Sequence, residues 1–216
     1  MFATAIASVF LVSFLLGSIP WGVIVSRLFF HTDVRQHGSG NIGATNALRT
    51  LGKKGGAAVF ALDVAKGLLS GAVVGLVSAM LPSQTPLSTV ELQVLSAMAF
   101  LACTWGHIFS PWLGFKGGKG IAVAFGCMMV AFGPVPGLIE LTAFIVVVAV
   151  LRYVSLGSIV AALLCPVAAT FVFWPNAWAI VLCSLAAATV VWAHRANIER
   201  LRAHAEPKLG SASEDR

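Results

Sequence analysis

Residues 121–151 read IAVAFGCMMVAFGPVPGLIELTAFIVVVAVL and carry a single charge, Glu140. The run is too long for one ordinary membrane span, which needs about 20 residues. At its centre, Gly133-Pro134-Val135-Pro136-Gly137 favours a turn, because proline breaks helices and glycine permits tight turns. The run therefore forms one very long helix or two short ones. Two helices of about 15 residues each fall below the usual minimum of about 17, which implies local thinning of the bilayer.

The rest of the chain is similarly apolar. Of its 216 residues, 58% are hydrophobic and only 10% are charged, whereas soluble domains carry about 25% charged residues. So few charges cannot cover a water-facing surface, and the sequence therefore predicts an all-α polytopic membrane protein. We expect one integral-membrane domain over residues 1–210 and a disordered tail at 211–216. The first apolar segment is expected to be kept as a helix, because no basic region precedes it as in a cleaved signal.

The basic residues decide between the two arrangements of residues 121–151. With two short helices the chain crosses seven times, and all 14 Lys and Arg residues fall on one side. One long helix would place Arg152 on the other side. Because basic loops stay in the cytoplasm, we expect seven transmembrane helices, the fourth and fifth short, with the N-terminus out, the C-terminus in and the active site on the cytoplasmic face. The expected spans are 3–28, 57–81, 91–109, 120–133, 137–152, 155–173 and 176–193.

The charge balance and the cysteines exclude other classes of site. The net charge of +6 lies in loops, so it indicates anionic lipids or substrates and not nucleic acid. The four cysteines lack CxxC or CxxH spacing and are expected to be small buried hydrophobic residues. We therefore expect neither a metal site nor a disulfide framework.

The first of three polar segments on the expected cytoplasmic face is HGSGNIGATNALR, residues 37–49. Its glycines allow backbone N–H groups to turn toward an anion, at Gly38, Gly40 and Gly43. Thr45 or Asn46 can cap a short helix, which places a helix N-terminus beside this loop. Arg49 follows about one turn later and can make a two-pronged anion contact. The alternative is a flexible glycine loop without a ligand.

The second segment is GFKGGKG, residues 114–120, directly before an apolar span. In the expected topology the N-terminal end of that span, with its positive dipole, faces this loop. The glycines and the two lysines, Lys116 and Lys119, therefore suit a phosphate or oxyanion site. The spacing is not that of a Walker A loop. The alternative is a basic anchor at the membrane surface.

The third segment is HRANIERL, residues 194–201, where the last span leaves the membrane. His194 and Asn197 stand three residues apart and share a helix face, which Arg200 continues. A histidine at an interface is either structural or catalytic, and the neighbouring amide and the shared membrane side favour catalysis. The two readings stay open on the residues alone.

Other polar residues are weaker candidates. Asp63 and Lys66 are three residues apart within the second expected span, where charges either pair or mark a site. We expect a structural pair near the interface, with a functional role as the alternative. His37 and His107 are weaker still. The chain lacks the GxSxG, HExxH and HxxxxD patterns and a carboxylate cluster for Mg²⁺, so the residues point to a metal-free reaction that handles two anionic groups.

Together the three segments resemble the membrane-integral acyl-phosphate:glycerol-3-phosphate acyltransferases of bacteria. The similarity runs from about residue 14 to residue 210. One departure is His204-Ala205-Glu206, where the family usually has Gly-Thr-Glu. The matching stretches are 38–46 with Arg49, 106–107 through 115–120, and His194 with Asn197, supported by 17–20 and 62–67.

The resemblance implies a multi-pass enzyme of the bacterial cytoplasmic (inner) membrane that uses no cofactor and no metal. It would transfer an acyl chain from acyl phosphate to the 1-hydroxyl of glycerol 3-phosphate, giving lysophosphatidic acid and phosphate in phospholipid biosynthesis. Its partners would be these two substrates and membrane lipids, with no nucleic acid. We expect a monomer that works near the soluble enzyme that makes acyl phosphate.

The resemblance carries over five active-site residues, and the two glycine loops add the expected binding residues. The expected catalytic residues are Ser39, Arg49, Lys119, His194 and Asn197. The expected phosphate- or substrate-binding residues are Gly38, Gly40, Asn41, Gly43, Thr45, Asn46, Lys116, Gly117, Gly118 and Gly120. In this hypothesis Asn197 positions His194, which orients or deprotonates the hydroxyl, and a phosphate oxygen of the substrate is the alternative base. The rival function is a transporter or channel for a phosphorylated anion, which the scarcity of polar residues within the spans disfavours.

Overall fold

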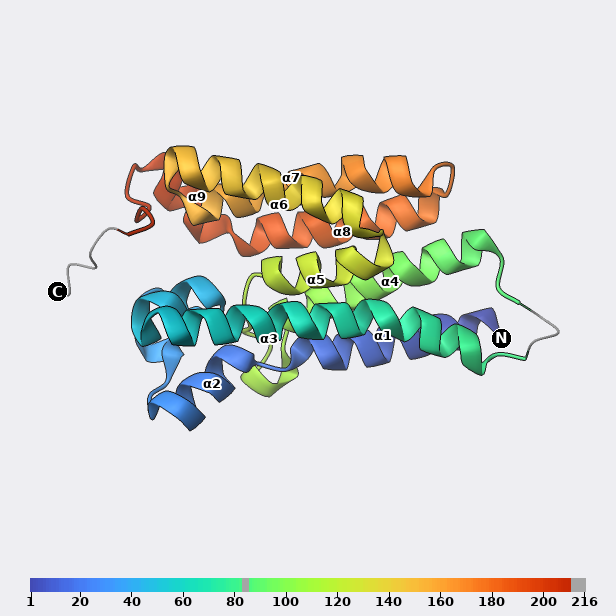
Figure 1. Ribbon diagram of the computed structural model, residues 1–216, viewed down its shortest axis with the longest axis horizontal. Helices are drawn as coiled ribbons and strands as arrows, with labels where there is room; N and C mark the ends of the chain where they lie inside the picture. The colour runs from blue at the N-terminus through green and yellow to red at the C-terminus, as the bar shows by residue number, and fades with distance from the viewer. Residues whose placement is uncertain (83–85, 211–216) are drawn as a thin grey trace.

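The computed structural model describes residues 1–82 and 86–210, and within them the regular secondary structure is entirely helical (Figure 1). The tail expected to be disordered, 211–216, lies outside the described residues. Two short 3₁₀ helices are η1 (Val34–Gln36) and η2 (Pro111–Leu113). The α-helices are α1 (Phe2–Ser18), α2 (Trp21–Phe30), α3 (Ala44–Met80), α4 (Thr89–Ile108), α5 (Ile121–Ala131), α6 (Pro134–Leu151), α7 (Val154–Phe173), α8 (Ala177–Ala193) and α9 (Arg195–Arg202).

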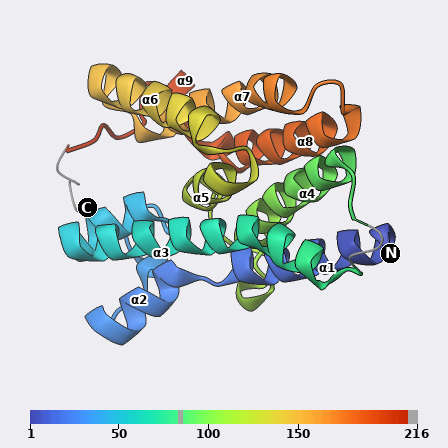
Figure 2. The ribbon, with the colours of Figure 1, turned by 45° about the vertical axis from the view of Figure 1, so that its right-hand side comes forward.

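The long helices run roughly side by side, in a bundle with three groups. Figures 1 and 2 show α6, α7 and α8 on one side and α1 and α3 on the other, with α4 and α5 between them. The N-terminal end of α1 and the short helix α9 lie at opposite ends of the bundle (Figure 1). Five spans are long and apolar enough to cross a membrane by length and composition, and a sixth follows if the bent pair α8 and α9 is one span. The protein is therefore a multi-pass membrane protein, and the count of seven stays a prediction.

The prediction of two short helices in residues 121–151 is correct for the first helix and wrong for the second. Helix α5 has 11 residues and is short, but α6 has 18. The turn lies at Phe132 and Gly133, and Pro134 is the first residue of α6. Proline is tolerated in a first helical turn because the N–H groups there have no partner within the helix. The prolines that were expected to form a turn therefore begin the next helix.

Two other helices depart from straight spans. The first apolar segment is divided at Ile19 and Pro20 into α1 and α2. Helix α3 contains a kink at Gly52, whose φ of 73° and ψ of −172° are not helical. Residues 44–51 therefore form a separate short helix before the long apolar part of α3, as the first polar segment predicted.

Two helix crossings depend on glycine. Where α1 meets α4, a Cβ at Gly17 would lie 2.1 Å from the carbonyl oxygen of Cys103, and one at Gly106 would lie 2.1 Å from that of Phe14. Where α3 meets α5, Gly67 and Gly126 are equally close to the opposing backbone, at 2.2 and 2.1 Å. Helices that associate within lipid gain from close backbone contact at small residues. The crossing of α3 and α5 fixes α5, and with it the loop that precedes α5.

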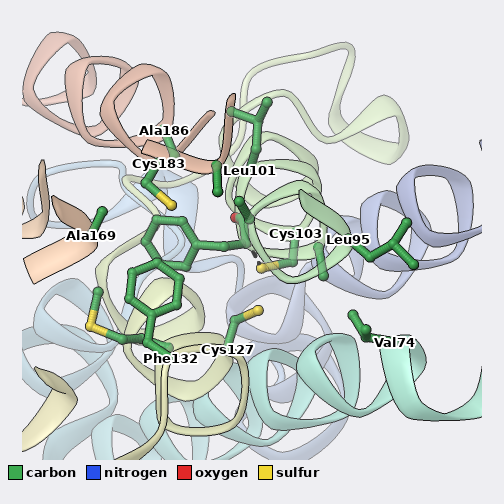
Figure 3. Packing of buried hydrophobic residues seen from close by; sticks show 14 of the residues in the cluster. Val74, Leu95, Leu101, Cys103, Cys127, Phe132, Ala169, Cys183 and Ala186 are labelled. Carbon is green, nitrogen blue, oxygen red and sulfur yellow. Dashed lines mark hydrogen bonds between the residues drawn. The ribbon is translucent and has the colours of Figure 1, made fainter. Parts of the chain in front are cut away.

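The core between these helices is small and apolar. Figure 3 shows Cys103, Cys127 and Cys183 among residues such as Leu101 and Phe132. All four cysteines are buried, which confirms their reading as small hydrophobic residues.

Candidate active site

A cavity of about 150 Å³ lies where the three polar segments meet. It is bounded by the first turns of α3, α5 and α7 and by the junction of α8 and α9. All five residues expected to be catalytic line it, namely Ser39, Arg49, Lys119, His194 and Asn197. Of the expected binding residues, Asn41, Gly43, Thr45, Asn46 and Gly120 line it as well. Gly38, Gly40, Lys116, Gly117 and Gly118 are not among its lining residues.

The first glycine loop is built around the side chain of Asn46, which is 2% exposed. Its Oδ1 accepts a hydrogen bond from the backbone N–H of Ser39 at 2.9 Å. Its Nδ2 donates to the carbonyl oxygens of Val34, His37 and Asn41 at 2.9, 3.1 and 2.8 Å. An amide nitrogen has two hydrogens, so two of these three acceptors share one hydrogen. One side chain thus holds the loop at four points.

These bonds change which groups can receive an anion. The N–H of Ser39 donates to Asn46, that of Gly40 to the His37 carbonyl, and that of Gly43 to Asn41 Oδ1. Two of the three amides that were expected to face an anion, those of Gly40 and Gly43, therefore donate within the loop. In the first turn of α3 the N–H of Asn46 donates to the Gly43 carbonyl. The N–H groups of Ala44 and Thr45 have no partner within the helix, and both residues line the cavity.

The N-cap of α3 was predicted at the wrong residue. The N-cap of α3 is Gly43, which makes no side-chain cap, and neither Thr45 nor Asn46 takes that position. Asn46 instead uses its amide to hold the loop, because its position in the first turn points it back at residues 34–41. The helix N-terminus still lies at the cavity, as expected.

The second glycine loop is tied to the end of α4. The N–H groups of Gly117 and Gly118 donate to the carbonyl oxygens of Ile108 and His107 at 2.9 and 3.0 Å. A Cβ at Gly118 would lie 2.1 Å from His107 Nε2. These glycines therefore position the loop against α4. The cavity itself receives Lys119, Gly120 and the first turn of α5.

Two helix N-termini thus converge on one cavity. The first turn of α3 contributes Ala44 and Thr45, and the first turn of α5 contributes Ile121 and Ala122. Helix N-termini bind anions through free N–H groups and a favourable dipole. The arrangement suits two anionic groups held side by side.

Lys119 is a strongly perturbed cation at the cavity. Burial lowers its pKa to about 8; the nearby carboxylate of Glu206 counters this effect, and the neighbouring Arg200 and Arg49 add to it. Cations that are close together repel one another, and an anion bound between them relieves the repulsion. The electrostatics of the cavity therefore favour an anionic ligand.

Behind the second loop lies a buried polar cluster. Lys66 Nζ is 2.9 Å from Asp63 Oδ1 and 2.9 Å from His107 Nδ1, and it donates to the carbonyl oxygen of Ile19 at 2.8 Å. The side chains of Asp63, Lys66 and His107 are at most 5% exposed. The predicted pair of Asp63 and Lys66 is confirmed, and His107 joins it. Asp63 and His107 also line the cavity, so the pair is not remote from the site.

His194 lies between α8 and α9, whose axes differ by 54°. Its Nδ1 is 2.8 Å from the carbonyl oxygen of Val190. A carbonyl oxygen only accepts, so Nδ1 carries the ring proton and Nε2 of the neutral ring is an acceptor. Burial lowers the pKa of His194 to about 4. The ring is thus neutral at physiological pH.

The predicted contact between His194 and Asn197 takes a different form. Asn197 Nδ2 donates to Glu206 Oε1 at 2.7 Å, and Arg200 Nε donates to Glu206 Oε2 at 2.7 Å. The hydrogen bond that orients His194 is the one it donates to the Val190 carbonyl, and Asn197 belongs to a network around Glu206. Burial opposes ionisation of Glu206, but side-chain hydrogen bonds, from Asn197 and Arg200 among them, hold its pKa below the usual value.

Sequence reasoning missed several cavity residues. Glu206 lies in the segment after α9, which folds back so that the N–H of Leu209 donates to the Arg152 carbonyl. The signal in the sequence was Glu206 itself, which matches the family pattern although its neighbours His204 and Ala205 depart from that pattern. Ser155 and Ser158 line the cavity from the first turns of α7. Their signal was two hydroxyls three residues apart on one face of a mostly apolar helix.

An apolar pocket of about 110 Å³ adjoins the charged cavity. Four residues line both, namely Phe60, Ile121, Ala122 and Phe144. The pocket continues between α5, α6, α7 and α8. Within residues 1–82 and 86–210, no three His, Cys, Asp or Glu side chains are grouped so that they could hold a metal ion.

Comparison with known sequences gives a consistent result. A family model described as glycerol-3-phosphate acyltransferase matches residues 7–204. The chain is 40% identical over 203 residues to the glycerol-3-phosphate acyltransferase of Thermosynechococcus vestitus, which covers 94% of each chain. It is 39% identical over 205 residues to the enzyme of that name from Clostridioides difficile, covering 94% of this chain and 95% of that protein.

Solved structures agree. The crystal structure of PlsY (YgiH), an integral membrane glycerol 3-phosphate acyltransferase, in its glycerol 3-phosphate form matches with a TM-score of 0.81 and 32% identity. The match covers 95% of this chain and 96% of that one. The lysophosphatidic acid form of PlsY matches with a TM-score of 0.78 and 30% identity over 95% of both chains.

Proposed function

The chain belongs to the glycerol-3-phosphate acyltransferase family, and we propose that its acyl donor is an acyl phosphate, which acylates the 1-hydroxyl of glycerol 3-phosphate. The products are lysophosphatidic acid and inorganic phosphate. The observation that carries this proposal is the convergence of two helix N-termini and Lys119 on one cavity that opens into an apolar pocket. A phosphate-bearing acyl donor and a phosphate-bearing acceptor need such a pair of anion sites.

We place the two phosphates by the groups that face the cavity. The first-turn amides of α3 and the hydroxyl of Ser39 hold the acyl phosphate. Arg49 and Lys119 neutralise glycerol 3-phosphate and the charge that develops on the carbonyl oxygen. Holding two mutually repelling anions in reacting geometry is a large part of the catalysis, because positioning alone contributes about 7–11 kcal/mol.

His194 is the residue we assign to the attacking hydroxyl. Its Nε2 is an acceptor, since Nδ1 donates to Val190, so it orients the hydroxyl by accepting its hydrogen. An acyl phosphate is a mixed anhydride, so attack on its carbonyl needs no covalent enzyme intermediate. The hydroxyl proton passes either to Nε2 or to a phosphate oxygen of the substrate. Asn197 and Glu206 support the site by fixing Arg200 and the segment after α9.

The acyl chain occupies the apolar pocket. The pocket shares Phe60, Ile121, Ala122 and Phe144 with the charged cavity, so a chain attached to a phosphate in the cavity extends into the pocket without crossing polar surface. The pocket is lined mainly by residues of α5, α6, α7 and α8. In this proposal the chain enters it sideways from the bilayer.

We further propose seven crossings of the bacterial inner membrane, with the N-terminus outside and the active site facing the cytoplasm. Support comes from the basic residues, all 14 of which then lie on one side. Alkaline phosphatase fused after Gly210 is expected to be inactive in cells, and a fluorescent protein fused there to be fluorescent. Active phosphatase at this position would contradict the orientation.

The donor is tested by measuring phosphate release from palmitoyl phosphate by the purified protein in EDTA, without acyl-CoA or acyl carrier protein. We expect release to depend on glycerol 3-phosphate and lysophosphatidic acid to form in equal amount. Turnover with acyl-CoA but not with palmitoyl phosphate would contradict the donor. Uptake of glycerol 3-phosphate into vesicles without turnover would instead support a transporter.

A further inference from the structure

The apolar pocket extends away from the charged cavity along two helices. On α7, Ser158 lines the cavity and Cys165 lines the pocket. On α8, Ala187 lines the pocket, and His194, which directly follows α8, lines the cavity. Each pair is seven residues apart, and an α-helix rises 1.5 Å per residue, so the pocket reaches about 10 Å beyond the cavity.

Glu140 lies in the deep part of this pocket. On α6, Phe144 lines both the cavity and the pocket, and Glu140 lines the pocket one turn further from the cavity. The other described residues that line the pocket are apolar. Glu140 Oε1 is buried and has no hydrogen-bond partner among the described residues.

A carboxyl in this position needs an explanation. Ionisable side chains within membrane helices are costly, and those that occur usually pair with another polar group or mark a functional site. A buried polar atom without a partner is similarly rare in folded proteins. Packing does not account for Glu140, because an apolar side chain of the same size would fill the space without that cost.

We propose that Glu140 limits the length of the acyl chain that the enzyme accepts. This inference rests on the proposed function, which places the chain in the pocket. Glu140 as a whole is partly exposed, so methylene groups that reach it would close its carboxyl off from water and pack against it without offering a hydrogen bond. A chain that ends before Glu140 gains from burial along the whole pocket. A longer chain loses that gain for each methylene that must pass the carboxyl.

The test measures a product distribution in one reaction. Acyl phosphates from decanoyl to stearoyl phosphate are supplied together with glycerol 3-phosphate, and the lysophosphatidic acids are quantified by mass spectrometry. The variants are E140M, which is apolar and similar in size, and E140Q, which has the same shape and stays polar. Product ratios within one sample do not depend on how much of each variant folds.

We expect E140M to shift the distribution toward longer chains. The shift should be about fourfold for each methylene newly accommodated, the ratio that corresponds to about 0.8 kcal/mol per buried methylene. E140Q should retain the wild-type distribution, because removing water from its amide costs about as much as removing it from the carboxyl of Glu140.

Two results would overturn the inference. The first is an unchanged distribution in E140M, and a shift in E140A in that case would make size the limiting property. The second is a shift in E140Q as large as that in E140M. In each of these cases the wild-type enzyme still uses acyl phosphates, so the proposed function stands. A wild-type protein that uses none of them would contradict both proposals.

Discussion

The Nζ atom of Lys66 lies 2.9 Å from Nδ1 of His107, 41 residues further along the chain. This contact joins α3 to the last turn of α4, whose carbonyl oxygens receive Gly117 and Gly118. Lys66 also neutralises Asp63 at 2.9 Å. A buried cluster therefore supports the loop that carries Lys119.

Replacing Lys66 alone is expected to destabilise the protein more than replacing both Lys66 and Asp63. In K66M the carboxylate of Asp63 is left buried and unpaired, which typically costs about 3–5 kcal/mol. In D63N/K66M neither side chain is charged, and we expect a smaller loss of stability than in K66M. Thermal unfolding of the three proteins in one detergent measures the difference. Equal losses in the single and double variants would show that the ion pair is not what Lys66 contributes.

Asn46→Asp is expected to open the first glycine loop. Aspartate keeps the shape and the acceptor for Ser39 but cannot donate to Val34, His37 and Asn41. Each lost hydrogen bond costs about 0.5–1.5 kcal/mol, and more where the carbonyl stays buried. We expect at least tenfold lower kcat/KM and faster proteolysis within residues 31–43.

A matched control for this variant is T50A, which loses one hydrogen bond, from Thr50 Oγ1 to the Asn46 carbonyl. It should keep near wild-type activity and protease resistance. N46D with the same resistance as T50A would contradict the role of Asn46 in holding the loop.

The pKa of Lys119 predicts an alkaline limit to activity. Burial lowers this pKa to about 8, so the side chain is charged below pH 8 and neutral above it. Since kcat/KM reports ionisations of the free enzyme, kcat/KM for glycerol 3-phosphate is expected to fall above about pH 8. In K119R the charge persists to high pH, so the fall should disappear although the absolute value is lower. An unchanged alkaline limb in K119R would assign the limb to another group.

His194 predicts an acid limit far below neutrality. Burial lowers its pKa to about 4, so Nε2 is an acceptor at neutral pH and gains a proton only as the pH falls toward 4. In the wild type kcat/KM should fall below about pH 5 for this reason. H194Q should lack that fall and lose about 10²- to 10⁴-fold in rate if His194 takes the proton. A modest loss with an unchanged profile would leave a phosphate oxygen as the base.

The glycine crossings predict a contrast between two alanine variants. A Cβ at Gly126 would lie 2.1 Å from the Val64 carbonyl oxygen, whereas one at Gly75 meets nothing within 4 Å. G126A is expected to lose about 1–3 kcal/mol of stability through overpacking. G75A should be as stable as the wild type or more stable by up to about 1 kcal/mol, because alanine favours a helix. Unfolding in detergent compares them, and equal stabilities would show that the crossing of α3 and α5 can widen freely.

The sequence predicted the position of the apolar helices well, because burial in lipid follows directly from composition. It placed the turn of residues 121–151 a few residues late, because proline is common both within turns and in the first turn of a helix. It brought Ser39, Arg49, Lys119, His194 and Asn197 to one site through the family resemblance.

The partners of these side chains could not be predicted. Glu206 takes its place only because the segment after α9 folds back onto Arg152. His194 is oriented by the carbonyl of Val190, a contact within the turn that ends α8. Such contacts depend on tertiary position, and residue types at a given spacing do not encode them.

The residues shared by the cavity and the pocket, Phe60 and Ile121 among them, have a kinetic consequence. In the proposed reaction each substrate has its phosphate in the charged cavity, but the lysophospholipid product holds the headgroup and the tail at once. Its departure would require both to leave together, sideways into the surrounding lipid. We therefore expect release, and not acyl transfer, to set the turnover rate, as it does in many enzymes. The lipids or detergent around the protein would therefore change kcat by accepting the product more or less readily, with no change in the chemical step.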